Sequence, residues 1–432
     1  MTKLNEYLEK SVVIGAAGKM GSGISLLILR ELTLGALSGT YTKPKLVLVD
    51  SREEALEGLS TYLMNQLEKY AEKKGDSLGV SSDQFLSSAK EIMILTNDMQ
   101  TVKGSRMVFE AILEEISVKT KVFTQLKELC AEDAYYMSNT SSIPISEIDQ
   151  KAGLSHRIIG FHFYNPPAVQ KLVELIIAEE TPSELVEISE ELGRRLGKIL
   201  VPSRDVAGFI GNGHFIRDIR YACDLVTQLA EKRPLHEAVY LVNRVSQDYM
   251  IRPMGIFQLL DYVGLDICRN IAAVMTQFVH NGSLSCDLVE KLLAAGVLGG
   301  QHADGSQKDG IFRYEKGKPS AVFSTENKEY ISLSEGDWVK QCDAELGELP
   351  DGFASWKEVM KSADRSKKLE DYFKHLFQGT SMGCKIAQKY LMRSREIAEQ
   401  LVGDGIAASS ADVNAVLENG FFHAYGPHNP YY

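Results

Sequence analysis

The chain has 432 residues, of which 44% are hydrophobic and 24% charged, and its formal net charge is −11. This length normally exceeds one hydrophobic core, so we expect two or three domains of an ordinary globular protein. The acidic balance argues against a nucleic-acid partner, which usually requires a basic face. It does not exclude an anionic small ligand, because lysines and helix N-termini can hold phosphates on an acidic protein.

The cysteines and the N-terminal segment bear on the compartment. None of the six cysteines forms a CxxC pair or a metal-ligand cluster; they are Cys130, Cys223, Cys268, Cys286, Cys342 and Cys384. Free thiols in a reducing cytoplasm, with no metal site, are therefore expected. The first ten residues are polar and mixed in charge, unlike a signal peptide. No apolar run is expected to reach the ~20 residues that cross a membrane, so no membrane partner is expected.

Apolar runs of strand length alternate with helical spacing through the first 206 residues. Short buried strands are predicted at 11–15, at 46–50, twice within 94–112 and at 134–142. HRIIGFHFY and KLVELIIA predict two more strands joined by a Pro-Pro turn, before a helix at about 183–197. This alternation predicts an α/β fold with a doubly wound, Rossmann-type parallel sheet over residues 1–206.

From Asn212 onward helical spacing dominates, which predicts an all-α C-terminal part. Two segments, 253–266 and 392–427, place a helix, an acidic segment and a Pro- or Gly-containing turn in similar order. We interpret them as a diverged internal repeat, with domains at 207–315 and 316–432. The segment 296–372 is rich in Gly, Lys, Ser and Asp, and we expect loops and at most a short hairpin there.

A glycine-rich turn, VIGAAGKMGSG, follows the first predicted strand and opens a helix. Gly18 and Gly21 fit the second and third glycines of a GxGxxG fingerprint, whereas the first position falls on Ala16 with Gly15 beside it. Glycines let the backbone approach a pyrophosphate, and the helix N-terminus supplies N–H donors. The alternative is a turn that needs glycine for packing alone; strand before and helix after favour a dinucleotide site.

Asp50 ends the next predicted strand, farther from the glycines than is usual for such sites. An acid there accepts hydrogen bonds from ribose hydroxyls and repels a 2′-phosphate, which favours NAD over NADP as the cofactor. The alternative is a solvated aspartate at a strand end.

Three polar residues stand at successive predicted strand ends: Ser138 in SNTSS, His162 in GFHFYNP and Glu174 in KLVEL. A carboxylate inside an apolar strand requires a partner, and His162 is the nearest candidate across the predicted antiparallel pair. A histidine paired with a carboxylate can remove a proton from an alcohol near neutral pH. The alternative is a structural ion pair or a satisfied core histidine.

Taken in order, these motifs resemble the 3-hydroxyacyl-CoA dehydrogenase family over about residues 11–315. The resemblance rests on the glycine turn, FEAILEEISVKTKVF, SNTSSIPISEI, HRIIGFHFYNP, KLVEL, VAGFIGN and PMGIFQLLDYVGLD. It implies that His162 is the general base and that Glu174 orients it. It also implies that Ser138 and Asn212 hydrogen-bond the substrate oxygen.

The resemblance also implies contacts for the cofactor and for coenzyme A. Asn165 would lie near the nicotinamide ribose, and Glu114 and Lys119 match positions that contact NAD. Lys73 is a candidate contact for the CoA moiety; the alternative for it is a solvated helix lysine. The second helical segment resembles the duplicated C-terminal domain of longer members. It could imitate the homodimer interface of short members within one chain, which leaves a monomer or a dimer open.

The resemblance implies NAD-dependent oxidation of an L-3-hydroxyacyl-CoA to the 3-oxoacyl-CoA, as in fatty-acid β-oxidation. A second enzyme hypothesis is a dehydrogenase of a free hydroxy acid, of the sugar-acid or carnitine type. A third is a catalytically retired NAD-binding protein with a structural role. The presence of all four polar groups at 138, 162, 174 and 212 argues against the third hypothesis.

Overall fold

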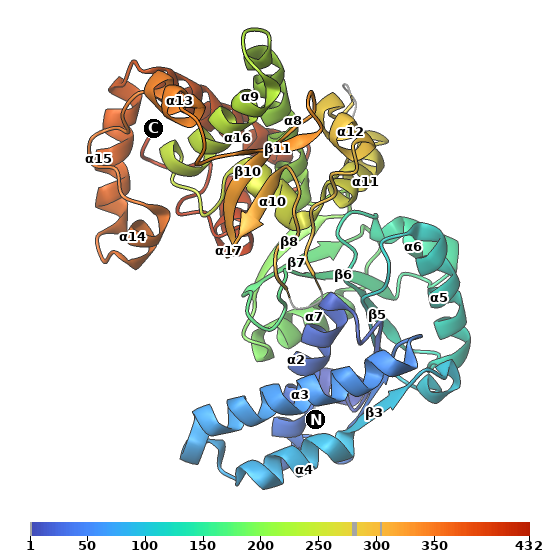
Figure 1. Ribbon diagram of the computed structural model, residues 1–432. Coiled ribbons are helices and arrows are strands. Elements are labelled where there is room, and N and C mark those ends of the chain that lie inside the picture. Colours follow the sequence, from blue (N-terminus) through green and yellow to red (C-terminus); the bar gives the residue numbers. More distant parts are fainter. Residues whose placement is uncertain (1, 279–282, 303–304) are drawn as a thin grey trace. The chain divides into compact units, whose positions relative to one another are not determined.

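The computed structural model describes residues 2–278, 283–302 and 305–432 (Figure 1). It divides into two compact units, Met1–Phe209 and Ile210–Tyr432. The first boundary lies three residues beyond the predicted end at 206, whereas both predicted helical domains fall within the second unit.

The first unit contains an eight-stranded sheet with the strand order β3-β2-β1-β4-β5-β6-β7-β8. Its strands are β1 (Lys10–Ile14), β2 (Lys45–Val49), β3 (Met93–Thr96), β4 (Met107–Glu110), β5 (Tyr135–Ser138), β6 (Ile158–Phe163), β7 (Leu172–Ile177) and β8 (Ile199–Arg204). The strands from β1 to β6 are parallel, β7 pairs antiparallel with β6, and β8 pairs parallel with β7. The predicted doubly wound sheet is confirmed, and its strand order reverses beside β1, the usual place for a dinucleotide.

Helices cover both faces of this sheet (Figure 1). The helical elements are α1 (Lys3–Leu8), α2 (Lys19–Leu37), α3 (Glu53–Lys74), η1 (Gly75–Leu78), α4 (Ser82–Ile92), η2 (Met99–Val102), α5 (Ile116–Leu129), α6 (Ile145–Ala152) and α7 (Ser183–Arg195). On one face of the sheet, Val13 belongs to a hydrophobic core that includes residues of α2, α3, α4 and α7. On the other face, Val12 and Ile14 belong to a second core that includes residues of α5 and α6. Because both faces are buried, the strands read as continuous apolar runs.

Helix α2 corrects one expectation from the sequence. It has 19 residues and is long and apolar enough, by length and composition, to cross a membrane. Its apolar residues, among them Ile24, Leu27 and Ile28, are buried in the first core of the unit. Its composition is thus accounted for by packing against the sheet, since a helix buried on most sides is apolar nearly all round.

The second unit is mainly helical but also contains a small antiparallel sheet. The helical elements are α8 (Gly211–Ala230), α9 (Leu235–Arg244), η3 (Val245–Tyr249), α10 (Ile256–Val263), α11 (Leu265–Thr276), α12 (Asp287–Ala294), α13 (Trp338–Leu346), α14 (Trp356–Lys361), α15 (Arg365–Gln378), α16 (Met382–Gly403) and α17 (Ser410–Gly420). The sheet has the order β11-β10-β9, with β9 (Phe312–Glu315), β10 (Lys318–Ser324) and β11 (Glu329–Ser332).

This sheet corrects the sequence expectation for 296–372. That segment was expected to form loops and at most a short hairpin, but it forms three paired strands, two complete helices and the start of a third. The predicted domain boundary at 315 also falls between β9 and β10, which pair with each other. Val322 and Phe323 are buried although most residues of this stretch of the sequence are polar. Tertiary packing therefore stabilises strands that the local composition does not predict.

Within the second unit, α16 packs directly on α8. His214 Nε2 lies 3.0 Å from Ser394 Oγ, and burial lowers the pKa of this histidine to about 4, so it is neutral at pH 7. Four apolar residues of the second helical segment are buried: Ile397, Leu401, Val413 and Leu417. Helix α10 of the first segment and helix α16 of the second both pack on α8, and whether the protein is a monomer or a dimer remains open.

Candidate functional site

The glycine turn between β1 and α2 has the shape that a dinucleotide requires. Gly15 has a φ of 76°, and a Cβ atom on Gly21 would lie 1.9 Å from the Gly15 carbonyl oxygen, so both positions need glycine for the fold itself. Gly18, the N-cap of α2, is less constrained, because a Cβ there would be 3.1 Å from the same oxygen. The fold itself therefore requires glycine less strictly at position 18 than at 15 and 21. A glycine at this helix N-terminus would let a pyrophosphate approach the backbone closely.

Asp50 follows β2 and is fixed against this turn. Its Oδ2 accepts a hydrogen bond from the Ala17 N–H at 3.0 Å, and its Oδ1 accepts from the Arg52 N–H at 3.1 Å. The side chain of Arg52 adds a contact of 3.3 Å to the same Oδ1. The structure thus places the acid beside the glycine turn, where the adenosine ribose of a dinucleotide would lie.

His162 and Glu174 face each other across β6 and β7, as predicted. They are directly paired in the antiparallel register, and His162 Nδ1 lies 3.2 Å from Glu174 Oε2. The Glu174 side chain is only 1% exposed. Because Nδ1 is turned toward the carboxylate, Nε2 is the ring nitrogen left to exchange a proton with a ligand. The ring of Phe209 stands 6.3 Å from the imidazole and supplies an apolar wall.

Tyr164 is a residue of this site that the sequence argument missed. Its hydroxyl donates to Glu174 Oε2 at 2.7 Å, which is the same oxygen that His162 contacts. Burial raises the pKa of Tyr164 well above its usual value, and the neighbouring Glu174 charge adds to this effect. Tyr164 therefore stays protonated and remains a hydrogen-bond donor. Its position two residues after His162 was the signal that could have identified it.

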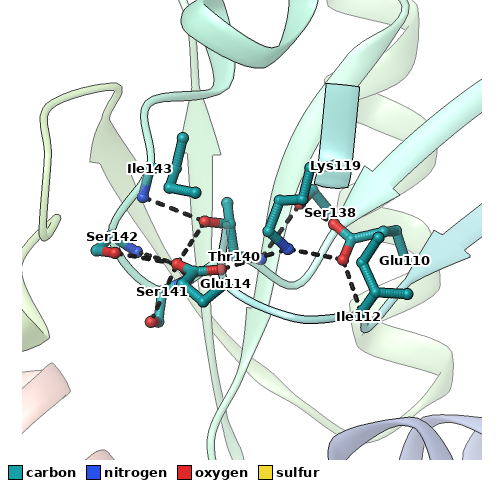
Figure 2. Close-up of polar contacts among 9 residues, drawn as sticks. All are labelled: Glu110, Ile112, Glu114, Lys119, Ser138, Thr140, Ser141, Ser142 and Ile143. Carbon is teal, nitrogen blue, oxygen red and sulfur yellow. Dashed lines mark hydrogen bonds and ion pairs between the residues drawn. The ribbon is translucent and has the colours of Figure 1, made fainter. Parts of the chain in front are cut away.

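A second buried cluster lies at the carboxyl ends of β4 and β5 (Figure 2). Glu110, the last residue of β4, is fully buried, and its Oε1 accepts from Lys119 Nζ at 2.7 Å and from the Ile112 N–H at 2.8 Å. Its Oε2 accepts the hydroxyl hydrogen of Ser138 at 2.5 Å. The sequence argument also missed Glu110, although a carboxylate ending an apolar strand was the signal used for Glu174.

Glu114 holds the SNTSS turn in place. Its Oε1 accepts from Thr140 Oγ1 at 2.7 Å and from the N–H groups of Ser141 and Ser142 at 2.8 and 2.9 Å, while Oε2 lies 3.3 Å from Lys119 Nζ (Figure 2). Burial by itself would raise the pKa of Glu114, but the Lys119 charge and these hydrogen bonds outweigh it and keep the pKa below its usual value. The acid is thus ionised at neutral pH.

These contacts bear on the roles expected for Ser138 and Lys119. Ser138 is fully buried and has its single hydrogen committed to Glu110. Lys119 is 1% exposed and bridges Glu110 and Glu114. Ser141, three positions beyond Ser138, is only partly buried, and its hydroxyl lies 3.3 Å from Glu114. The direct ligand contacts predicted for Ser138 and Lys119 remain predictions.

Three predicted site residues and a possible metal site remain to be located. Asn165 follows β6 immediately after Tyr164 and is partly buried. Lys73 is exposed in the last turn of α3. Asn212 lies in the first turn of α8, in the second unit, so its predicted substrate contact stays a prediction. In the ranges that the structure describes, no group of three or more His, Cys, Asp or Glu side chains could hold a metal ion.

Comparison with known proteins agrees with this geometry. Residues 10–206 match the family profile of the 3-hydroxyacyl-CoA dehydrogenase NAD binding domain, and residues 208–309 match that of the C-terminal domain. The chain is 31% identical to a probable 3-hydroxybutyryl-CoA dehydrogenase of Bacillus subtilis over 291 residues, which are 67% of this chain and 94% of the relative. It is 30% identical to the human mitochondrial hydroxyacyl-coenzyme A dehydrogenase, over 70% of this chain and 92% of the relative.

A solved structure extends the likeness of fold to nearly the whole chain. The 3-hydroxybutyryl-CoA dehydrogenase of Escherichia coli covers 97% of this chain and 90% of its own, with a TM-score of 0.65 and 21% identity. The NAD-binding profile identifies the cofactor as NAD, in agreement with the glycine turn and Asp50. The chain therefore belongs to the 3-hydroxyacyl-CoA dehydrogenase family of NAD-dependent oxidoreductases.

Proposed function

We propose that this protein oxidises an L-3-hydroxyacyl-CoA to the 3-oxoacyl-CoA, with His162 as the general base. The observation that carries the proposal is the buried contact of 3.2 Å between His162 Nδ1 and Glu174 Oε2. Bound NAD would accept the hydride from C3 of the substrate, held by the glycine turn and Asp50. His162 Nε2 would take the hydroxyl proton, and Glu174 would compensate the charge that the imidazole gains.

Within the SNTSS turn, we assign the substrate contact to Ser141 in preference to Ser138. The Ser138 hydroxyl is buried and donates to Glu110 at 2.5 Å, whereas Ser141 is partly exposed and its hydroxyl lies 3.3 Å from Glu114 Oε1. A hydroxyl that already serves a carboxylate at 2.5 Å has no hydrogen left for a substrate oxygen. Ser141→Ala should therefore weaken substrate binding, with little change in the affinity for NADH.

A substrate screen tests the proposal against its rivals. Initial rates are measured with NAD and 3-hydroxyacyl-CoAs of several chain lengths, and with free hydroxy acids that include a sugar acid and carnitine. Turnover that requires the CoA moiety is expected. Turnover of the free acids at comparable efficiency would favour the alternative of a hydroxy-acid dehydrogenase. NADH binding without turnover of any substrate would favour a retired enzyme.

Asp50 is proposed to select NAD over NADP, because its carboxylate lies beside the glycine turn and would repel a 2′-phosphate. The wild type should prefer NAD by a wide margin in kcat/KM, and Asp50→Ser should narrow that margin. Asp76→Ser, which changes an exposed aspartate after α3, is the control. Equal efficiency with the two cofactors in the wild type would contradict the assignment.

A further inference from the structure

Strand β6 and the residue that follows it bring two polar side chains, His162 and Tyr164, to a single carboxylate oxygen on β7. Glu174 Oε2 lies 3.2 Å from His162 Nδ1 and 2.7 Å from the Tyr164 hydroxyl. The tyrosine contact is the shorter of the two, and the ring centroids of Tyr164 and His162 are 4.9 Å apart. Two donors thus share the negative charge of one oxygen atom.

We infer that Tyr164 is a positioning residue for the proposed reaction: its hydrogen bond to Glu174 weakens the attraction between that carboxylate and His162 and keeps the imidazole in its proton-accepting form. The inference rests on the proposed function. Hydrogen bonds to an ionised acceptor are strong, and a donor at 2.7 Å draws charge away from a second donor at 3.2 Å. An imidazole with an undivided carboxylate would hold its proton more tightly and would accept the substrate proton less readily.

The charged and apolar groups around His162 come from the neighbouring strands of the first unit. On β7, the carboxylate of Glu174 contacts the imidazole of His162. After β8, the uncharged ring of Phe209 lies near the same imidazole. On the β4 and β5 side, the charged groups are Glu110, Glu114 and Lys119, which are bonded to one another. Tyr164 is a neutral side chain placed to adjust how strongly Glu174 holds His162.

The decisive variant is Tyr164→Phe, which removes one hydroxyl and keeps the ring. The pH dependence of kcat/KM for alcohol oxidation is measured between pH 5 and pH 9. The acid limb, where protonation of the base stops the reaction, should move to higher pH by roughly 0.5–1 unit, the size expected for one modest hydrogen bond. Tyr41→Phe is the matched control, because it removes a tyrosine hydrogen bond to Glu31 at 3.1 Å elsewhere in the unit.

A second background tests whether Tyr164 acts through Glu174. In a Glu174→Gln protein the charge that Tyr164 modulates is gone, so adding Tyr164→Phe should no longer move the acid limb. A shift of the same size in both backgrounds would overturn the inference, because it would show that Tyr164 acts by another route. No shift, or a shift to lower pH, in the single variant would also overturn it.

An assay without turnover separates this inference from the proposed function. The proton resonance of the His162 ring is followed by NMR across the same pH range and is assigned by its absence in His162→Ala. Protonation of His162 at higher pH in Tyr164→Phe than in the wild type supports the inference even if no acyl-CoA is oxidised. An unchanged titration overturns the inference, while turnover of 3-hydroxyacyl-CoAs by the wild type would leave the proposed function standing.

Discussion

Two buried glutamates of the first unit, Glu110 and Glu174, meet the same physical problem in different ways. Each lies in an apolar strand and is almost completely inaccessible, so each needs partners for its charge. Glu110 is paired with Lys119, a permanent cation at neutral pH. Glu174 is paired with His162, whose charge depends on the reaction and on pH.

The difference indicates which cluster is a scaffold and which is reactive. The carboxylate oxygens of Glu110 accept hydrogen bonds from Lys119, Ile112 and Ser138. The neighbouring Glu114 accepts hydrogen bonds from the SNTSS segment. Such a network of hydrogen bonds and ion pairs fixes the ends of β4 and β5. The His162 cluster can gain and release a proton, because its cation is an imidazole.

The largest effect on activity should come from His162→Ala. Loss of the general base should lower turnover by about 100-fold to 10,000-fold, while the affinity for NADH stays near that of the wild type. Stopped-flow turnover and NADH fluorescence titration measure the two quantities. His375→Ala, an exposed histidine of α15, is the control. Normal turnover in His162→Ala would show that the reactive cluster has been misassigned.

Lys119→Met should have the largest effect on stability. It leaves Glu110 and Glu114 without their shared cation, and an uncompensated buried charge costs about 3–5 kcal/mol. The free energy of unfolding is measured by urea denaturation. Lys121→Met, an exposed lysine on the same helix, should change it little. If both variants are equally stable, the Glu110 cluster does not have the scaffold role given to it here.

Glu174→Gln should reduce turnover less than loss of the histidine, by about 10-fold, which is below the ~100-fold to 10,000-fold that a positioned acid–base group contributes. Without the carboxylate charge, His162 should lose its proton more easily, so the acid limb of the pH profile should move to lower pH. Glu179→Gln, just beyond β7, is the exposed control. An acid limb that moves to higher pH would contradict the proposed electrostatic role.

The smallest effect concerns Glu114 at acid pH. Its pKa is lowered in the folded state, so its contribution to stability is present above the unfolded value of about 4.3 and is lost as the pH falls below it. The unfolding free energy of the wild type should therefore decrease between about pH 4.5 and pH 3. In Glu114→Gln this decrease should be shallower. Parallel curves for the two proteins would show that Glu114 is not strongly held by Lys119 and the turn.

Much of the first unit could be predicted from local sequence. Continuous apolar runs between polar turns predicted the strands of the sheet, because a strand covered on both faces needs apolar side chains at every position. The same reasoning placed Glu174 opposite His162, since antiparallel strands joined by a short turn pair in a register that the pattern defines. The glycine turn and Asp50 were predicted because backbone geometry and strand-end acids have short-range signatures.

Other features were decided by packing between distant segments. Residues 312–332 are polar enough to predict loops, but they form a three-stranded sheet in the second unit, in which Val322 and Phe323 are buried. Similarly, the sequence analysis assigned the substrate contact of the SNTSS turn to Ser138. Only the fold shows that Ser138 is buried against Glu110.

By itself, the sequence determined the sheet, the glycine turn and the pairing of His162 with Glu174, because these depend on neighbours along the chain or across one hairpin. The tertiary structure decided which charge each buried carboxylate meets. Lys119, on helix α5, forms an ion pair with Glu110, and the Tyr164 hydroxyl donates a hydrogen bond to Glu174. Neither contact follows from the spacing of these residues in the sequence alone. The reason is that a buried charge is stabilised by the groups that surround it in three dimensions, wherever they lie in the chain.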